Sequence, residues 1–219
     1  MELSIIFEDR FLIVCCKPAG VLSEDGGMPE LLAAQCGVPR VFCVHRLDKA
    51  VSGIMVYAKD GKTAARLSEA ISSRAVTKEY LAVVPGTPMP AQSVLRDLLF
   101  HDTAKNKTYV VQRPRRGVKE AELAYETLQT VPAAEGTGTL SLLRITLHTG
   151  RSHQIRAQFA ARKLPLLGDG RYGSSVRDCG IALRSHRLAF VHPVTGAALD
   201  LTAPLPDTQP WTLFSSDLQ

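Results

Sequence analysis

A polar segment, His45-Arg-Leu-Asp-Lys-Ala-Val-Ser-Gly53, lies between two apolar stretches at residues 41–44 and 54–58. Its Asp48 is the only carboxylate between Glu30 and Asp60, and basic residues lie close to it on both sides. A cationic setting favours the ionised carboxylate, the form that a nucleophile or a general base needs. The alternative interpretation is an arginine–aspartate brace across a surface turn, and the spacing alone favours that brace.

A second polar segment, Thr149-Gly-Arg-Ser-His-Gln-Ile-Arg156, leads into a helical pattern for which Ser152 is the expected N-cap. Arg151 and Arg156 then flank a helix N-terminus, where the helix dipole disfavours each cation by about 0.3–1 kcal/mol. Two cations in one turn indicate a partner anion, either a carboxylate or a phosphate. Arg156 also borders an apolar stripe, so we expect it to be half buried beside an acid, for which Asp48 is a candidate.

Two short segments resemble cofactor-binding motifs, but the residues in and around them do not fit those motifs. Gly168-Asp-Gly-Arg-Tyr-Gly173 has dinucleotide-binding spacing but lacks the preceding strand and following helix, and Val56 occupies the first glycine position of an apparent P-loop that ends at Thr63. The nucleophile elbow of the α/β-hydrolases is absent from the sequence. Three histidines without metal-ligand spacing are interpreted as polar surface residues: His148, His153 and His186. We therefore expect no metal, nucleotide or redox cofactor.

The net charge of +5 is concentrated in one part of the chain. Residues 1–100 hold 11 basic and 11 acidic residues, whereas residues 101–187 hold 15 basic and 7 acidic ones. Residues 103–119 contain six cations and no acid. Such an excess is typical of a surface that faces a polyanion, and a solvated basic face without a partner is the alternative. Tyr109 in this stretch is either a stacking residue or part of a strand core.

The hydrophobic pattern favours an α+β fold. Short apolar runs predict strands at residues 3–7, 11–16, 54–58, 80–84, 123–128, 140–147 and 188–191, and several of these runs are apolar on both faces. Amphipathic stripes predict helices at residues 62–73 and 152–163. Many strands and few helices without regular alternation indicate a mixed, largely antiparallel central sheet flanked by helices. With 219 residues we expect a single catalytic domain over residues 1–219.

The five cysteines include no C-x-x-C pair, which argues against a disulfide framework and against a zinc site. We interpret them as buried free thiols in a reducing, cytoplasmic environment. The longest apolar run, residues 11–16, is far shorter than the roughly 20 residues of a membrane helix, and the acidic first ten residues are not typical of a secretory signal. A cytoplasmic protein without a membrane partner is therefore expected.

The segment around Asp48 resembles the signature of the RluA family of RNA pseudouridine synthases, and four more motifs resemble that family in the same order. They are Lys17-Pro-Ala-Gly20, Lys78-Glu-Tyr-Leu-Ala-Val-Val-Pro-Gly86, Gly150-Arg-Ser-His-Gln-Ile-Arg156 and Gly168-Asp-Gly-Arg-Tyr-Gly173. The chain departs from the family pattern at Val51, where threonine is frequent, and at Arg184, where histidine is frequent. We expect a compact member of the family without an S4 RNA-binding module.

The resemblance implies isomerisation of a specific uridine to pseudouridine in structured ribosomal or transfer RNA, in an RNA-binding cleft and without a cofactor. It makes Asp48 the catalytic residue, Tyr80 a side chain that packs against the target base, and Arg156 the cation that keeps Asp48 ionised. Because the target uridine is inaccessible in a stacked helix, it must be flipped out. The residues expected to bind substrate are Arg46, Leu47, Lys105, Lys107, Arg113, Arg115, Arg116 and Arg151.

Other interpretations of the same residues remain open. An RNA-binding protein could keep this fold without catalysis, although the presence of Asp48, Tyr80 and Arg156 argues against that reading. A hydrolase that uses Asp48 and His45 without a cofactor has no oxyanion or nucleophile motif in its support. We expect the protein to be a monomer.

Overall fold

Two parts of the chain each pack around a core of their own in the computed structural model, which describes residues 2–133, 138–176 and 179–215. The first unit comprises residues 1–79 and 184–204, and the second comprises residues 80–183 and 205–219. The divisions fall inside the strand β5 (Thr77–Pro85) and at the start of β10 (Leu183–Val191). Within the described ranges, every helix is too short or too polar to cross a membrane.

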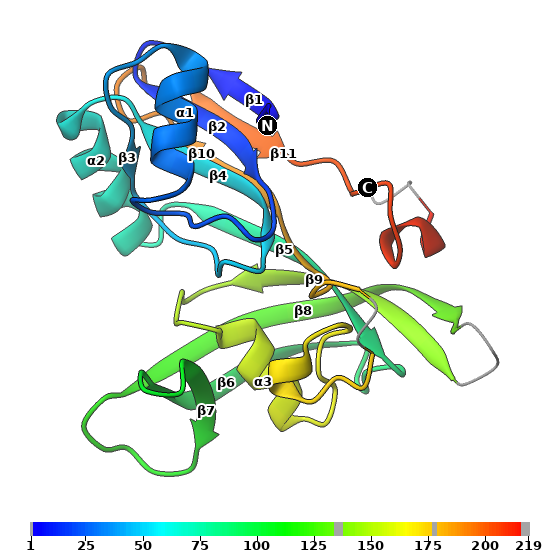
Figure 1. Ribbon diagram of the computed structural model, residues 1–219. Coiled ribbons are helices and arrows are strands. Elements are labelled where there is room, and N and C mark those ends of the chain that lie inside the picture. Colours follow the sequence, from blue (N-terminus) through cyan, green and yellow to red (C-terminus); the bar gives the residue numbers. More distant parts are fainter. Residues whose placement is uncertain (1, 134–137, 177–178, 216–219) are drawn as a thin grey trace. The chain divides into compact units, whose positions relative to one another are not determined.

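The first unit is built on a mixed sheet (Figure 1). Its elements are β1 (Ile5–Glu8), β2 (Leu12–Lys17), α1 (Met28–Cys36), β3 (Phe42–Cys43), β4 (Ser52–Ala58), α2 (Gly61–Ser72), β10 and β11 (Ala198–Thr202). The strands follow the order β1-β2-β4-β10, with β3 paired to β4 and β11 paired to β10. The pairing of β4 with β10 is parallel, and the other pairings described in this unit are antiparallel. This confirms the predicted mixed, largely antiparallel sheet.

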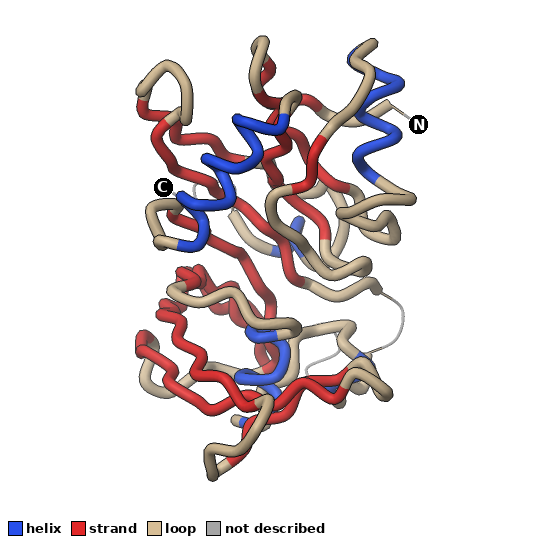
Figure 2. Tube along the Cα trace, turned by 90° about the vertical axis from the view of Figure 1, so that its left-hand side faces the viewer, coloured by secondary structure: helices blue, strands red, loops and turns tan. Residues whose placement is uncertain are grey.

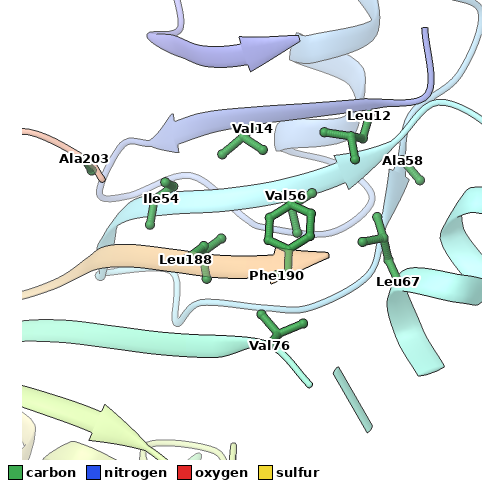
Figure 3. Packing of buried hydrophobic residues seen from close by; sticks show 10 residues of the cluster. All are labelled: Leu12, Val14, Ile54, Val56, Ala58, Leu67, Val76, Leu188, Phe190 and Ala203. Carbon is green, nitrogen blue, oxygen red and sulfur yellow. The ribbon is translucent and has the colours of Figure 1, made fainter. Parts of the chain in front are cut away.

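One face of the first unit's sheet packs against α2. Alternate residues such as Val14, Val56 and Phe190 point to the same side of their strands and meet Leu67 of the helix (Figure 3). The helix begins where the Asp60 carboxylate accepts hydrogen bonds from two backbone N–H groups of the first turn, both at 2.9 Å. The apolar stripe and this cap together explain why the sequence predicts the helix.

The other face of β2 and β4 is equally apolar, as predicted for central strands. Cys15 and Tyr57 on that face are fully buried, and so are Met28 and Leu32 of α1. In Figure 2, α2 runs across the front of this unit's strands, and α1 stands apart from it beside the N-terminus. The Tyr57 hydroxyl donates a hydrogen bond of 3.1 Å to the carbonyl of Ser23, in the segment that leads into α1. The sequence pattern does not predict the helix α1.

The described part of the second unit is a sheet with antiparallel pairings and one α-helix. Its elements are the end of β5, β6 (Gln92–Asp102), β7 (Lys107–Val111), β8 (Val118–Pro132), β9 (Thr139–Leu147), α3 (Gln154–Ala161) and two short 3-10 turns, Gly170–Tyr172 and Trp211–Leu213. The strands follow the order β5-β9-β8-β6-β7. Leu81, Val83 and Leu142 form part of its core with Trp211. The basic stretch at residues 103–119 comprises the connection before β7, β7 itself, the connection after it and the first two residues of β8.

The start of α3 differs from the prediction. Ser152 is not the N-cap, because its carbonyl accepts a hydrogen bond of 2.7 Å from the Thr108 hydroxyl and the helix begins two residues later. His153 occupies the cap position with a left-handed φ of 52°. The helix has no side-chain cap among the described residues, and the Gln154 side chain instead accepts a hydrogen bond of 3.0 Å from the Arg151 N–H, which fixes the turn that leads into the helix.

Candidate active site

The loop that carries Asp48 connects β3 to β4 and is fixed through its backbone. The Ser23 hydroxyl donates to the Leu47 carbonyl at 2.9 Å and accepts from the Leu47 N–H at 3.0 Å. The Val51 N–H donates to the Asp48 carbonyl at 2.9 Å and closes the turn. Gly20 in the Lys17-Pro-Ala-Gly20 turn donates its N–H to the Lys49 carbonyl at 2.7 Å. These bonds fix the backbone on both sides of Asp48, and none of them uses its carboxylate.

Lys17 at the end of β2 is the strongest support of this loop. Its side chain is 0% exposed, and its ammonium donates to the carbonyls of Pro18 at 2.9 Å, Val21 at 2.8 Å and Lys49 at 3.2 Å. Burial lowers the pKa of Lys17 to about 8, and the negative charge of Asp48 opposes part of that shift. Asp48 therefore interacts electrostatically with a buried cation of its own unit. This agrees with the cationic setting that the sequence predicts for Asp48.

This buried ammonium predicts a specific pH dependence of stability. The folded state releases the Lys17 proton near pH 8, whereas the unfolded chain keeps it to about 10.5, so stability rises with pH between these values. From pH 7 to pH 9.5 the contribution amounts to about 2 kcal/mol. Between these two pH values, we expect the unfolding free energy of the wild type to rise by this amount relative to that of Lys17→Met. Denaturant titration at each pH measures it. Equal pH slopes in the two proteins would contradict the assignment.

His45, at the start of the loop, has a structural role. Its Nε2 accepts a hydrogen bond of 3.1 Å from the Val56 N–H of β4. Burial, with a contribution from the positive charge of Lys78, lowers the pKa of His45 to about 3, so the ring is neutral near pH 7. The only nitrogen lone pair of a neutral imidazole is then already used. This argues against a hydrolase in which His45 acts as a general base.

Arg46 and Leu47, both expected to bind substrate, differ in their surroundings. Leu47 is buried in the first unit. Arg46 is exposed, and its guanidinium forms an ion pair with Glu24 at 3.0 Å. Because an exposed ion pair contributes little to stability, exchanging Glu24 for a phosphate would cost little. Their role in binding stays a prediction.

Arg156 and Asp169 form a deeply buried ion pair in the second unit. Their side chains are 6% and 1% exposed, and two parallel hydrogen bonds join them: Nε to Oδ2 at 2.6 Å and Nη2 to Oδ1 at 2.9 Å. The guanidinium also lies over the ring of Tyr172, at 4.9 Å from its centre. Arg156 is thus more deeply buried than expected, and it has the buried acid that the sequence predicts it to need. Asp169 is a residue that the sequence analysis recognised only as part of a turn.

The Tyr172 hydroxyl connects this pair to the basic stretch. It accepts a hydrogen bond of 2.8 Å from the Thr108 N–H of β7, and it lies 3.0 Å from the Nδ1 of His153. His153 is therefore a half-buried member of a hydrogen-bond network, whereas the sequence analysis interpreted it as a polar surface residue. The Arg151 side chain donates to the Glu120 carbonyl at 2.9 Å, beside the same stretch.

The expected phosphate-binding residues lie on β7 and on the connections that flank it. Lys107 is half-buried, and its ammonium lies 5.6 Å from the centre of the Tyr109 ring. Tyr109 is exposed, so it is available for stacking and does not belong to the strand core. The remaining expected phosphate-binding residues are exposed: Lys105, Arg113, Arg115 and Arg116. The Arg115 guanidinium covers the Phe100 ring at 4.5 Å.

Asp48 lies in the first unit, whereas Tyr80, which is buried, and Arg156 lie in the second. Their convergence in one site stays a prediction. Within the described residues, no group of three or more His, Cys, Asp or Glu side chains is arranged to hold a metal ion. All five cysteines are free thiols, and Cys15 is the one that is fully buried.

Comparison with known proteins identifies the class of this chain. Residues 11–161 match the family described as RNA pseudouridylate synthase. Ribosomal large subunit pseudouridine synthase D of Vibrio cholerae is 33% identical over 94% of this chain and 68% of that protein. The uncharacterized RNA pseudouridine synthase slr1629 of Synechocystis sp. is 31% identical over 94% of this chain and 66% of its own length. The chain thus spans about two thirds of the length of these relatives.

Two solved structures have the same fold as this chain. The human RNA pseudouridylate synthase domain containing 4 aligns with a TM-score of 0.76 and 24% identity, over 93% of this chain and 89% of the other. The human RNA pseudouridylate synthase domain containing 1 gives a TM-score of 0.79 and 22% identity, over 94% and 84%. The chain belongs to the RNA pseudouridine synthase family and is of the RluA type. It is an isomerase that acts on uridine in RNA.

Proposed function

We propose that this enzyme converts specific uridines of structured ribosomal RNA to pseudouridine, with Asp48 as the catalytic residue. The observation that carries the proposal is the Asp48 loop, whose backbone is fixed at Leu47 and Lys49 and whose carboxylate lies near the buried ammonium of Lys17. A fixed, ionised carboxylate is what a nucleophile or base requires. The choice of ribosomal RNA rests on the relative of Vibrio cholerae, which is named for the large ribosomal subunit.

The reaction breaks the bond between the sugar and N1 of uracil and joins the sugar to C5, and the C5 proton is replaced by one at N1. Substrate and product contain the same atoms, so the reaction needs neither a co-reactant nor a redox cofactor. Asp48 starts the reaction, Tyr80 packs against the target base, and the Arg156 guanidinium holds the Asp48 carboxylate ionised and oriented. We propose that the two units act together as one catalytic domain over residues 1–219, in a cytoplasmic monomer.

The target uridine has to leave the base stack, which costs a few kcal/mol. Contacts to the RNA backbone must offset that cost. We propose that exposed cations of the basic stretch supply these contacts to a cleft for the RNA, together with Arg46, Leu47 and Arg151. Transfer RNA is the second candidate substrate, since the same chemistry and the same charge distribution would serve it.

The proposed function is tested by incubating the purified protein with transcripts of ribosomal and transfer RNA and mapping pseudouridine at single-nucleotide resolution. We expect one or a few positions in ribosomal RNA to be modified without added metal or nucleotide. Modification of transfer RNA alone would overturn the substrate assignment. Binding of RNA without any pseudouridine would favour the inactive alternative.

The basic stretch gives a separate prediction about salt dependence. Each phosphate contact adds about 0.7–0.9 to the slope of log affinity against log salt concentration. Replacing Arg113, Arg115 and Arg116 by alanine should therefore flatten that slope by about two units, with a similar loss of affinity for target and unrelated RNA. A control removes three exposed cations of the first unit, Lys62, Arg66 and Arg74, and should leave the slope almost unchanged. Equal slopes in both triple variants would show that the RNA binds elsewhere.

A further inference from the structure

Arg184 is a buried cation that the proposed mechanism does not use. It lies at the start of β10, and the parallel pairing with β4 sets it opposite Ser52, four residues after Asp48. Its side chain is 8% exposed. The sequence analysis singled out this position as a departure from the family pattern without giving it a role.

The guanidinium of Arg184 has few acceptors. Nη1 donates to the Ser52 hydroxyl at 3.1 Å, and Nη2 lies 3.7 Å from the Cys16 sulfur, which is a weak acceptor. Nε is buried and has no hydrogen-bond partner among the described residues. A guanidinium carries five N–H donors, so three of those of Arg184 are uncommitted within the described part of the chain. No carboxylate among the described residues forms an ion pair with it.

Three other cations that are buried or partly buried are compensated. Arg187, three residues later on β10, forms ion pairs of 2.6 Å with both Glu79 and Asp200. Arg156 has Asp169, and the ammonium of Lys17 has three carbonyl acceptors. Arg184 alone in this comparison combines deep burial with a hydroxyl and a thiol as its acceptors. The burial of the Arg184 charge without a carboxylate or carbonyl acceptor among the residues described therefore needs an explanation.

Removing a charge from water without a counter-charge is costly, and the desolvation that burial imposes also lowers the pKa of Arg184. An arginine nevertheless remains a cation near neutral pH. A ligand oxygen with a negative charge would compensate this cost and use the uncommitted donors. The planar guanidinium suits a phosphate group in particular, because two N–H groups can point to two phosphate oxygens.

We propose that Arg184 binds a phosphate group of the RNA strand beside the nucleotide that is modified. The proposal rests on the proposed function, because RNA is the polyanion that this enzyme acts on and its only anionic groups are phosphates. It assigns a substrate-binding role to a side chain of the first unit, on the face of the sheet that also carries Cys16 and Ser52.

The backbone explains how Arg184 is kept close to the Asp48 loop. Gly53 has a φ of +124° and pairs with Ser185. A Cβ atom at Gly53 would lie 2.1 Å from the Ser185 carbonyl oxygen, so only glycine allows the two strands to approach this closely. The four residues from Asp48 to Ser52 can span at most about 14 Å, and the turn at Val51 shortens that distance. A phosphate at Arg184 would therefore belong to the target nucleotide or to a close neighbour.

The decisive experiment compares two arginines of the same strand. Arg184→Met removes an uncompensated charge, whereas Arg187→Met removes a charge that two carboxylates compensate. For Arg184→Met we expect an unchanged or higher melting temperature, an RNA dissociation constant about tenfold larger, and a salt slope smaller by about 0.7–0.9. For Arg187→Met we expect a lower melting temperature and a dissociation constant within about twofold of the wild type. The probe is a folded ribosomal RNA transcript in a filter-binding assay at several salt concentrations.

Arg184→Lys completes the test, because lysine keeps the charge and loses the planar fork. We expect it to retain the wild-type salt slope with an intermediate dissociation constant. Two results would overturn the proposal: Arg184→Met that binds RNA like the wild type, or Arg184→Met with a large loss of melting temperature, which would make the guanidinium a structural donor. RNA binding and melting are measured without turnover. A failure to form pseudouridine would therefore contradict the proposed function, while the comparison of the Arg184 and Arg187 variants would still test phosphate binding.

Discussion

Asp48→Asn is expected to lower the rate of pseudouridine formation by on the order of 10³-fold or more, while RNA affinity stays within a few-fold of the wild type. The substitution removes the negative charge and the nucleophilic or basic oxygen, and it changes the side-chain volume little. The loop itself is held through backbone groups of Leu47, Asp48 and Lys49, all of which remain in the variant. The rate is measured in single-turnover experiments at saturating RNA, so that binding and chemistry are separated.

The matched control is Asp25→Asn, which makes the same chemical change at an exposed aspartate of the first unit. This control should keep both the rate and the affinity of the wild type. If Asp48→Asn formed pseudouridine near the wild-type rate, another group would have to start the reaction. If it lost RNA binding as well as activity, the Asp48 carboxylate would be a binding group in the first place.

The strands were the most predictable part of this fold. Each of the seven apolar runs corresponds to a strand, and the central strands β2 and β4 are apolar on both faces because a helix-bearing layer lies over each face. Five of the observed strands are longer than the predicted runs, since residues beyond the apolar run still pair in the sheet, whereas β1 and β2 are not longer than theirs. The strand β8, for example, begins at Val118, five residues before the predicted run.

The missed elements have weak or misleading local patterns. The helix α1 spans only nine residues, has proline at its second position and follows two glycines, so its sequence resembles a loop. The strands β6 and β7 form a hairpin in which most positions are only partly buried, and its apolar residues come in runs of two or three, such as Leu98–Phe100 and Tyr109–Val111. Tertiary pairing with β8 stabilises β6 where local propensity does not.

The residue types of the candidate site could be predicted from the sequence. The residues that hold them in place were harder to predict. The position of Asp48 among cations is visible in the sequence. The burial of Lys17 is not, because the three carbonyls that accept from its ammonium come from turns that only folding brings together. The sequence predicts a buried acid beside Arg156 and offers Asp48 as the candidate, whereas the buried ion pair described above is with Asp169. The available signal for Asp169 was a lone aspartate close to the apolar Leu166 and Leu167.

Asp169→Asn is expected to destabilise the protein by about 3–5 kcal/mol, because it removes the buried negative charge that two hydrogen bonds join to the buried Arg156 guanidinium. For a chain of this size the loss corresponds to a decrease in melting temperature on the order of 10 °C. The control is Asp200→Asn, which removes one carboxylate from the more exposed pair with Arg187 and should cost about 1 kcal/mol or less. Melting followed by circular dichroism distinguishes the two.

A double variant separates the structural and catalytic contributions of this pair. Replacing Arg156 by methionine in the Asp169→Asn background removes the buried cation that has lost the Asp169 charge, so much of the lost stability should return. Activity should not return, because the proposed function needs the Arg156 guanidinium to keep Asp48 ionised. Recovery of stability together with activity would show that the pair only stabilises the second unit. A double variant as unstable as Asp169→Asn alone would instead show that the asparagine is poorly tolerated in the turn, whatever the charge of its partner.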